Sequence, residues 1–99
     1  MPDLKDLIVV LAGIHINDRD RSRVVNVAGH LITFILEERW HRLSEHQQQA
    51  LIKDSANRLW KNYMTKRKNY ELPPTEAAKQ AISEEIEKLK QLFNPNHTQ

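Results

Sequence analysis

Residues 21–43 read RSRVVNVAGHLITFILEERWHRL and form the most apolar segment of the chain. Its apolar residues recur at helical spacing and cover more than half of the circumference of a helix, which predicts a long, central and buried element. Asp18 or Asp20 is expected to cap its N-terminus. Gly29 lies inside this helix, and because glycine costs a helix about 1 kcal/mol, we expect a neighbouring helix to approach closely there.

Two further helices are predicted on either side of this segment. Apolar residues follow helical spacing over about residues 3–14, which favours a short first helix. On the other side, Ser44 is followed three residues later by Gln47, the pattern of a capping box. We therefore expect a helix over about residues 45–68, joined to the apolar helix by a tight turn.

The prolines of the chain indicate where the last helix begins. Residues 72–74 read Leu-Pro-Pro and are expected to end the preceding helix, because a residue before proline avoids helical backbone angles. Thr75 is the predicted cap of a fourth helix over about residues 76–93. Residues 1–95 are thus predicted to form one helical domain, and residues 96–99 a disordered tail.

The fold predicted from these patterns is all-α, a compact antiparallel bundle of four helices. The chain has 99 residues, of which 39% are hydrophobic and 28% charged, as is typical of a single globular domain. It has no cysteine, which excludes disulfides and thiolate chemistry. The apolar run over residues 7–12 is shorter than the ~20 residues of a membrane span. We expect a soluble, unexported, cytoplasmic protein without membrane contacts.

Candidate catalytic and metal-binding groups are scattered. His30, Glu37 and His41 share the polar strip of the apolar helix, but one helix cannot bring all three around a metal ion, so a surface pair of Glu37 with His41 is expected. The two glycines, Gly13 and Gly29, cannot form a glycine-rich phosphate loop. We predict no enzyme activity, no metal, no cofactor and no small-molecule substrate.

Three acidic residues of the predicted fourth helix could form either a chemical site or an ordinary charged surface. Glu84, Glu85 and Glu87 point in different directions around a helix, so a shared acid–base or cation site is not favoured. We expect them to be surface charges, with Glu84 paired to Lys88 one turn later.

Positive charge is concentrated in the middle of the chain. Residues 1–43 carry six basic and six acidic residues, residues 44–70 carry six and two, and residues 71–99 carry three and five. The net charges are therefore 0, +4 and −2, although the whole chain carries only +2. This uneven charge would orient the protein toward a polyanionic partner, whereas the alternative is an ordinary solvated surface.

The cations of the predicted third helix share one face. Lys53, Lys61 and Lys68 fall within an arc of roughly 80° on a helix that turns 100° per residue. Tryptophan at the edge of such a face can stack on an unpaired base, or it can seal a contact between helices or subunits. The predicted nucleic-acid-binding residues are Arg19, Arg21, Arg23, Lys53, Arg58, Trp60, Lys61, Arg67 and Lys68.

Two functions remain open on these grounds. The first is a module that follows the backbone of RNA or single-stranded DNA without strong sequence preference. The second is a protein–protein or homo-oligomeric adaptor, in which another chain covers the excess apolar surface and the basic face has no nucleic-acid role.

In size, all-helical pattern, lack of catalytic motifs and basic helix face, the chain resembles the small subunit of CRISPR effector complexes. The resemblance spans the whole chain. It implies a helical bundle that acts in antiviral defence, assembles with other protein subunits, and holds the guide or displaced strand. The residues that it implies for this role are Lys53, Arg58, Lys61, Arg67 and Lys68.

Overall fold

The computed structural model describes residues 3–94, and the secondary structure in this range is entirely helical. The elements are α1 (Leu4–Ala12), α2 (Ser22–Leu36), the short 3-10 helix η1 (Glu37–Arg42), α3 (Glu45–Lys68) and α4 (Pro74–Phe93). The predicted all-α bundle of four helices is confirmed. The tail predicted for residues 96–99 lies outside the described residues.

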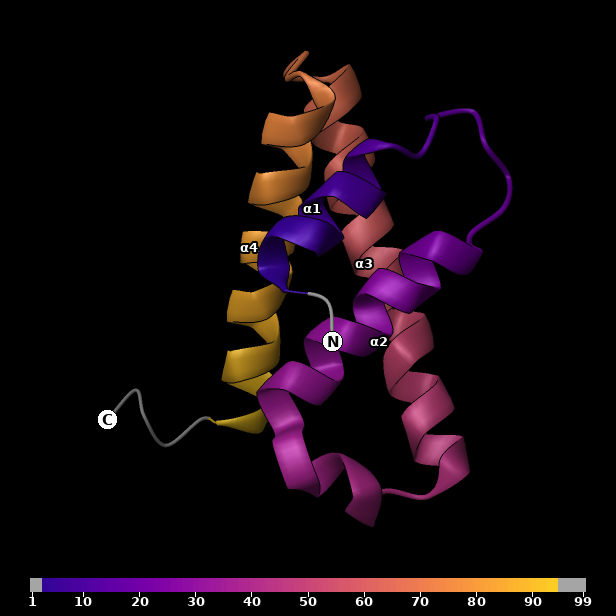
Figure 1. Ribbon diagram of the computed structural model, residues 1–99, viewed down its shortest axis with the longest axis vertical. Helices are drawn as coiled ribbons and strands as arrows, with labels where there is room; N and C mark the ends of the chain where they lie inside the picture. The colour runs from indigo at the N-terminus through magenta and orange to yellow at the C-terminus, as the bar shows by residue number, and fades with distance from the viewer. Residues whose placement is uncertain (1–2, 95–99) are drawn as a thin grey trace.

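Helix α2 packs against α1, α3 and α4, whereas the longer α3 packs mainly against α2 and α4. Helix α3 runs antiparallel to α4 on one side and lies against α2 on the other, while the short α1 lies across α4 and α2 (Figure 1). The molecule measures 38 × 32 × 22 Å along its principal axes. Because α2 and α4 cover two sides of α3, a third side of α3 remains exposed to solvent.

All four helices contribute side chains to one core. Leu11, Leu31, Leu59 and Ile82 are among its fully buried members, one from each helix. Burying a side chain of this size contributes about 1.5–3 kcal/mol relative to leaving it exposed. The apolar surface predicted for α2 is nevertheless broader than the surface that is buried, because Phe34 on this helix is 69% exposed.

The predicted continuous helix over residues 21–43 is wrong for residues 37–43. Helix α2 ends at Leu36, since Glu37 has φ 53° and ψ −128°, angles that an α-helix does not contain. The chain then continues as the 3-10 helix η1. Arg39 closes this break by donating hydrogen bonds to the carbonyls of Ile35 and Leu36, at 3.1 and 3.2 Å, and of Phe93, at 3.0 Å. One guanidinium therefore satisfies the open carbonyl ends of both α2 and α4.

The predicted start of α3 is confirmed, whereas the predicted cap of α4 is wrong. Ser44 Oγ accepts a hydrogen bond from the Gln47 N–H at 3.1 Å, and Gln47 Oε1 accepts one from the Ser44 N–H at 2.9 Å, which is a complete capping box. Helix α4 begins at Pro74 and not after Thr75. Proline fits the first position of a helix because its missing N–H would have no partner there.

The close helix approach expected at Gly29 is not found. A Cβ atom added to this glycine would meet the Ile52 Cδ1 atom at 4.0 Å, an ordinary contact distance. Gly29 therefore leaves space between α2 and α3. The prediction was that the two helices approach closely at this glycine.

A buried polar cluster joins α3 to α4. Glu85 is fully buried and accepts hydrogen bonds from Ser55 Oγ at 2.6 Å, and from Arg58 Nε and Nη2 at 3.0 and 2.7 Å. These hydrogen bonds raise the pKa of the Arg58 guanidinium. The prediction of Glu85 as a surface charge is thus wrong, and Glu84 pairs across the helices with Lys66 at 2.8 Å.

Candidate nucleic-acid interface

The exposed side of α3 carries a lysine strip formed by Lys53, Lys61 and Lys68. All three lysines are solvent-exposed, and none of them forms an ion pair with a carboxylate within residues 3–94. Asp54, the acidic residue in the middle of α3, exerts its field on Arg58 on the side toward α4. The lysine strip is therefore available to an external anion.

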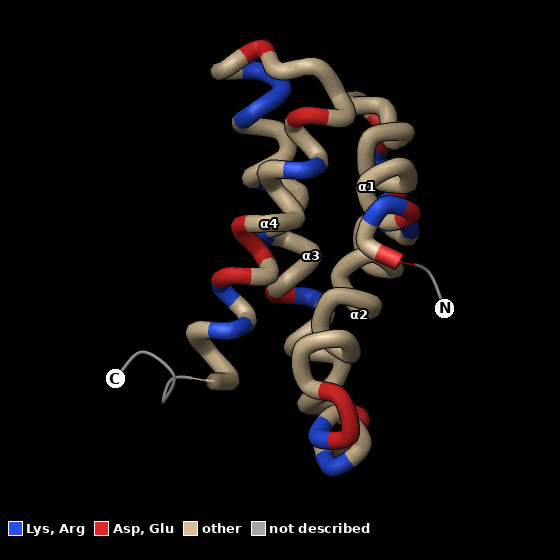
Figure 2. The backbone as a smooth tube through the Cα atoms, turned by 60° about the vertical axis from the view of Figure 1, so that its left-hand side comes forward, with Lys and Arg blue, Asp and Glu red and all other residues tan. Residues whose placement is uncertain are grey.

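Other cations of α3 are engaged inside the fold. Figure 2 shows basic residues in a cluster at the end of α3, and this last turn contains Lys66, Arg67 and Lys68. Arg67 Nη1 donates a hydrogen bond to the Leu72 carbonyl at 2.8 Å and so holds the turn between the helices. Arg58 donates hydrogen bonds to Glu85 and so joins α3 to α4. The structure thus separates Arg58 and Arg67 from the lysine strip with which they were grouped.

A groove of about 250 Å³ lies between α2 and α3, beside the lysine strip. We call it the α2–α3 groove. Apolar side chains form its floor: Val24, Val25, Ile52 and Ala56. Its polar lining consists of the cations Arg21, Lys53 and Lys61 and the amides Gln49 and Asn57, and no carboxylate lines it among the described residues.

Trp60 closes one end of the α2–α3 groove. The Cζ atom of Arg21 lies over the Trp60 ring, 4.4 Å from its centroid, which is a cation–π contact. Tyr63 lies 5.5 Å away between ring centroids and is buried, which raises the pKa of its phenol. Trp60 is therefore held from the core side by Tyr63 and presents its ring together with Arg21 at the groove.

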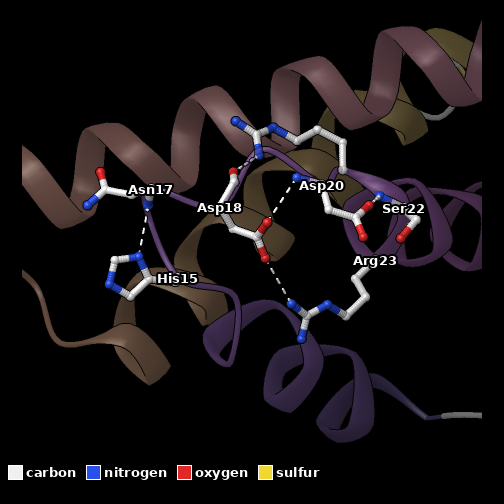
Figure 3. Close-up of polar contacts among 7 residues, drawn as sticks. His15, Asn17, Asp18, Asp20, Ser22 and Arg23 are labelled. Carbon is white, nitrogen blue, oxygen red and sulfur yellow. Dashed lines mark hydrogen bonds and ion pairs between the residues drawn. The ribbon is translucent and has the colours of Figure 1, made fainter.

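The loop before α2 positions two of the three predicted arginines, and Figure 3 shows the polar contacts of this loop. Asp18 accepts hydrogen bonds from the Asp20 N–H at 2.9 Å and from Arg23 Nη2 at 3.1 Å, and its carbonyl accepts one from Arg21 Nη1. These contacts hold the Arg21 and Arg23 side chains against the loop that precedes α2. Arg19 is exposed and makes no polar contact within residues 3–94.

The expected aspartate cap of α2 takes a different form. The N-cap position is Arg21, which has no side-chain capping bond. Asp20 instead accepts a hydrogen bond from the Ser22 N–H at 2.8 Å, one residue further on (Figure 3). The hydrogen bonds from Ser22 lower the pKa of the Asp20 carboxyl.

A second hollow adjoins the first along the same two helices. It shares Val25 and Ile52 with the α2–α3 groove and extends past His30 to His41. No group of three histidine, aspartate or glutamate side chains within residues 3–94 is arranged to hold a metal ion. The hollow therefore extends the groove along α2 and α3. Its described residues do not form a metal centre.

Part of this site could be predicted from the sequence. Gln49, Lys53, Asn57 and Lys61 follow each other at four-residue spacing and therefore lie on one strip of a helix, although the two amides were not among the predicted residues. The contribution of α2 could not be predicted, because the contact of Arg21 with Trp60 joins residues that are far apart in the sequence.

Fold and site together define an all-helical bundle with a basic, partly apolar groove. No helix among residues 3–94 combines the length and the apolar character needed to cross a membrane. The chain matches no family model, and comparisons with curated proteins and with solved structures found no match.

Proposed function

We propose that this chain is a non-catalytic nucleic-acid-binding protein that holds the backbone of RNA or single-stranded DNA on the exposed side of α3. The observation that carries this proposal is the lysine strip, which forms no ion pair with the described residues and lies beside a groove that none of their carboxylates lines. Lysines of this kind contact phosphates and release counterions, which supplies affinity without sequence preference.

The geometry of the lysine strip suits an extended backbone. At ~1.5 Å of rise per residue, Lys53 lies about 12 Å from Lys61 along α3, and Lys61 lies about 10 Å from Lys68. A strand laid along α3 would therefore meet a cation at each of three successive points. The Arg21 guanidinium, which lies over the Trp60 ring, adds a stacking surface next to the middle lysine.

We further propose that the protein works in the cytoplasm within a larger ribonucleoprotein complex, as the resemblance to the small subunit of CRISPR effector complexes implies. Val9 on α1 and Phe34 on α2 support contacts with other subunits, because they are 66% and 69% exposed. These two side chains also favour the second candidate, a protein-interaction adaptor without a nucleic-acid role. Sizing at high dilution tests whether that adaptor associates with itself.

The salt dependence of binding tests the nucleic-acid function. Three phosphate contacts on a single strand predict a slope of about −2 for the logarithm of the association constant against that of the salt concentration. The double variant Lys53→Gln/Lys61→Gln removes two of the contacts and should bring the slope close to about −0.7. The measurement is fluorescence anisotropy of a labelled RNA and of a labelled single-stranded DNA.

The matched control changes two exposed lysines of α4. Lys79→Gln/Lys90→Gln removes the same charge from the chain but leaves the lysine strip intact, so its slope should equal that of the unaltered protein. Equal slopes for both double variants would mean that the overall charge, and not the α3 face, attracts the nucleic acid. Absence of binding at low salt would leave the adaptor function.

A further inference from the structure

We infer that the α2–α3 groove receives one unpaired nucleobase while the lysines at its rim hold the adjoining phosphates. This inference rests on the proposed function and adds to it a distinct base-binding site. It also assigns the protein to single strands, because the bases of a duplex are stacked inside the helix and cannot enter a groove on a protein surface.

The lining of the groove matches each part of a nucleotide. The guanidinium of Arg21, which lies over the Trp60 ring, offers a flat surface of the kind on which bases stack, and the apolar floor excludes water from the base. Gln49 and Asn57 each supply both a donor and an acceptor, which is what the edge of a base requires. Lys53 and Lys61 lie at the same groove for the phosphates.

The size of the groove also favours a base over a larger ligand. Its volume of about 250 Å³ is below the ~300–1,000 Å³ of pockets that enclose drug-sized molecules. One planar ring system is therefore a better occupant than a whole helix of a partner protein. An acidic, apolar peptide would use the same cations and the same floor, and it enters the test as the competing occupant.

The first experiment removes the bases but keeps the phosphates. A short single-stranded oligodeoxythymidylate is compared with an abasic chain of equal length. Because stacking of a base is worth ~1–3 kcal/mol, the abasic chain should bind about 5- to 150-fold more weakly. Its salt slope should be unchanged, since the phosphate contacts are the same.

A spectroscopic signal locates the base. The chain has two tryptophans, so in Trp40→Phe the emission comes from Trp60 alone. The thymidylate strand should quench this emission at saturation, whereas the abasic strand should leave it nearly unchanged. A duplex of the same length should behave like the abasic strand.

A variant that fills the groove tests the site without changing charge. Val25 is 40% exposed at the groove, so Val25→Phe adds volume there and leaves the core intact. It should lower thymidylate affinity to the level of the abasic strand while keeping the salt slope. Val9→Phe makes the same change at an exposed site on α1 outside the groove and should bind like the unaltered protein.

Several outcomes would overturn the inference, and they differ from those that overturn the proposed function. Equal affinity for the two strands, with a steep salt slope for both, would keep the phosphate-binding function and remove the base site. Quenching of Trp60 by a peptide of alternating glutamate and leucine, together with none by thymidylate, would assign the groove to a protein partner. No binding of either strand would remove the proposed function itself.

Discussion

Glu37 occupies a backbone conformation that side chains rarely adopt. Its φ of 53° with ψ of −128° lies where glycine is favoured, and such residues cost about 1–3 kcal/mol each. The residue marks the end of α2 and the start of η1. The contacts of Arg39 with the carbonyls around this break explain how the conformation is held in place.

Relief of this backbone strain should stabilise the protein. In Glu37→Gly we expect the free energy of unfolding to rise by about 1 kcal/mol, since the strain relieved exceeds the extra entropy of glycine in the unfolded chain. Denaturant unfolding followed by circular dichroism measures the change. The control is Glu38→Gly, at an exposed neighbour with negative φ, which should lower the stability by about 0.5–1 kcal/mol. Destabilisation by both changes would contradict the assigned strain.

Two residue-level errors of the sequence analysis have a common physical cause. Glu85 lies on the same stripe of α4 as Ile82 and Leu89, so its position, three residues after one and four before the other, already indicated burial. Its charge argued against burial, because the partner Arg58 lies on another helix. Conversely, Val25 is one of the apolar residues from which the buried helix over residues 21–43 was predicted, yet it is 40% exposed.

At the scale of the elements, local signals predicted the helices, and tertiary contacts decided where two of them begin or end. The capping box at Ser44 and the proline pair at the start of α4 involve neighbouring residues only, so both signals could be read from the sequence. No proline or glycine near Leu36 indicates in the sequence that α2 ends there. This helix end depends in part on Arg39, which reaches the Phe93 carbonyl at the end of α4, 54 residues away.

The contact between α3 and α4 should depend strongly on the charge of Glu85. Arg58→Met leaves this carboxylate buried without its cation and should lower the free energy of unfolding by about 3 kcal/mol. Neutralising the acid in Arg58→Met/Glu85→Gln should recover part of that loss, because the amide oxygen can still accept the Ser55 hydrogen bond.

The comparison for this contact is the more exposed ion pair between the same helices. Glu84→Gln breaks the ion pair with Lys66, in which the Glu84 side chain is 49% exposed and the Lys66 side chain 12% exposed. It should cost about 1 kcal/mol, because the neutral amide oxygen can still accept a hydrogen bond from the Lys66 ammonium group. Thermal unfolding of the variants compares the two effects. An Arg58→Met variant as stable as Glu84→Gln would show that the buried cluster does not hold α3 to α4.

For the whole molecule, the position of α3 determines what its surface can do. Its sides toward α2 and α4 are covered, and the buried cluster engages Arg58 on the side toward α4. The lysine strip remains on the exposed side, next to the α2–α3 groove, whose floor is formed by small and branched apolar residues of the two helices. The amphipathic pattern predicted this division of charge, whereas the groove required the relative placement of two helices.

The account therefore depends on one surface, and charge reversal tests it most directly. Lys53→Glu/Lys61→Glu places two carboxylates at the rim of the α2–α3 groove, and Lys79→Glu/Lys90→Glu makes the same change in net charge on α4. Affinity for labelled single-stranded RNA and DNA at low salt is measured for both variants, after circular dichroism has shown that each is folded. We predict that the first variant loses detectable binding and that the second retains most of it. Equal affinity in the two variants would contradict the central claim that the exposed side of α3 holds nucleic acid.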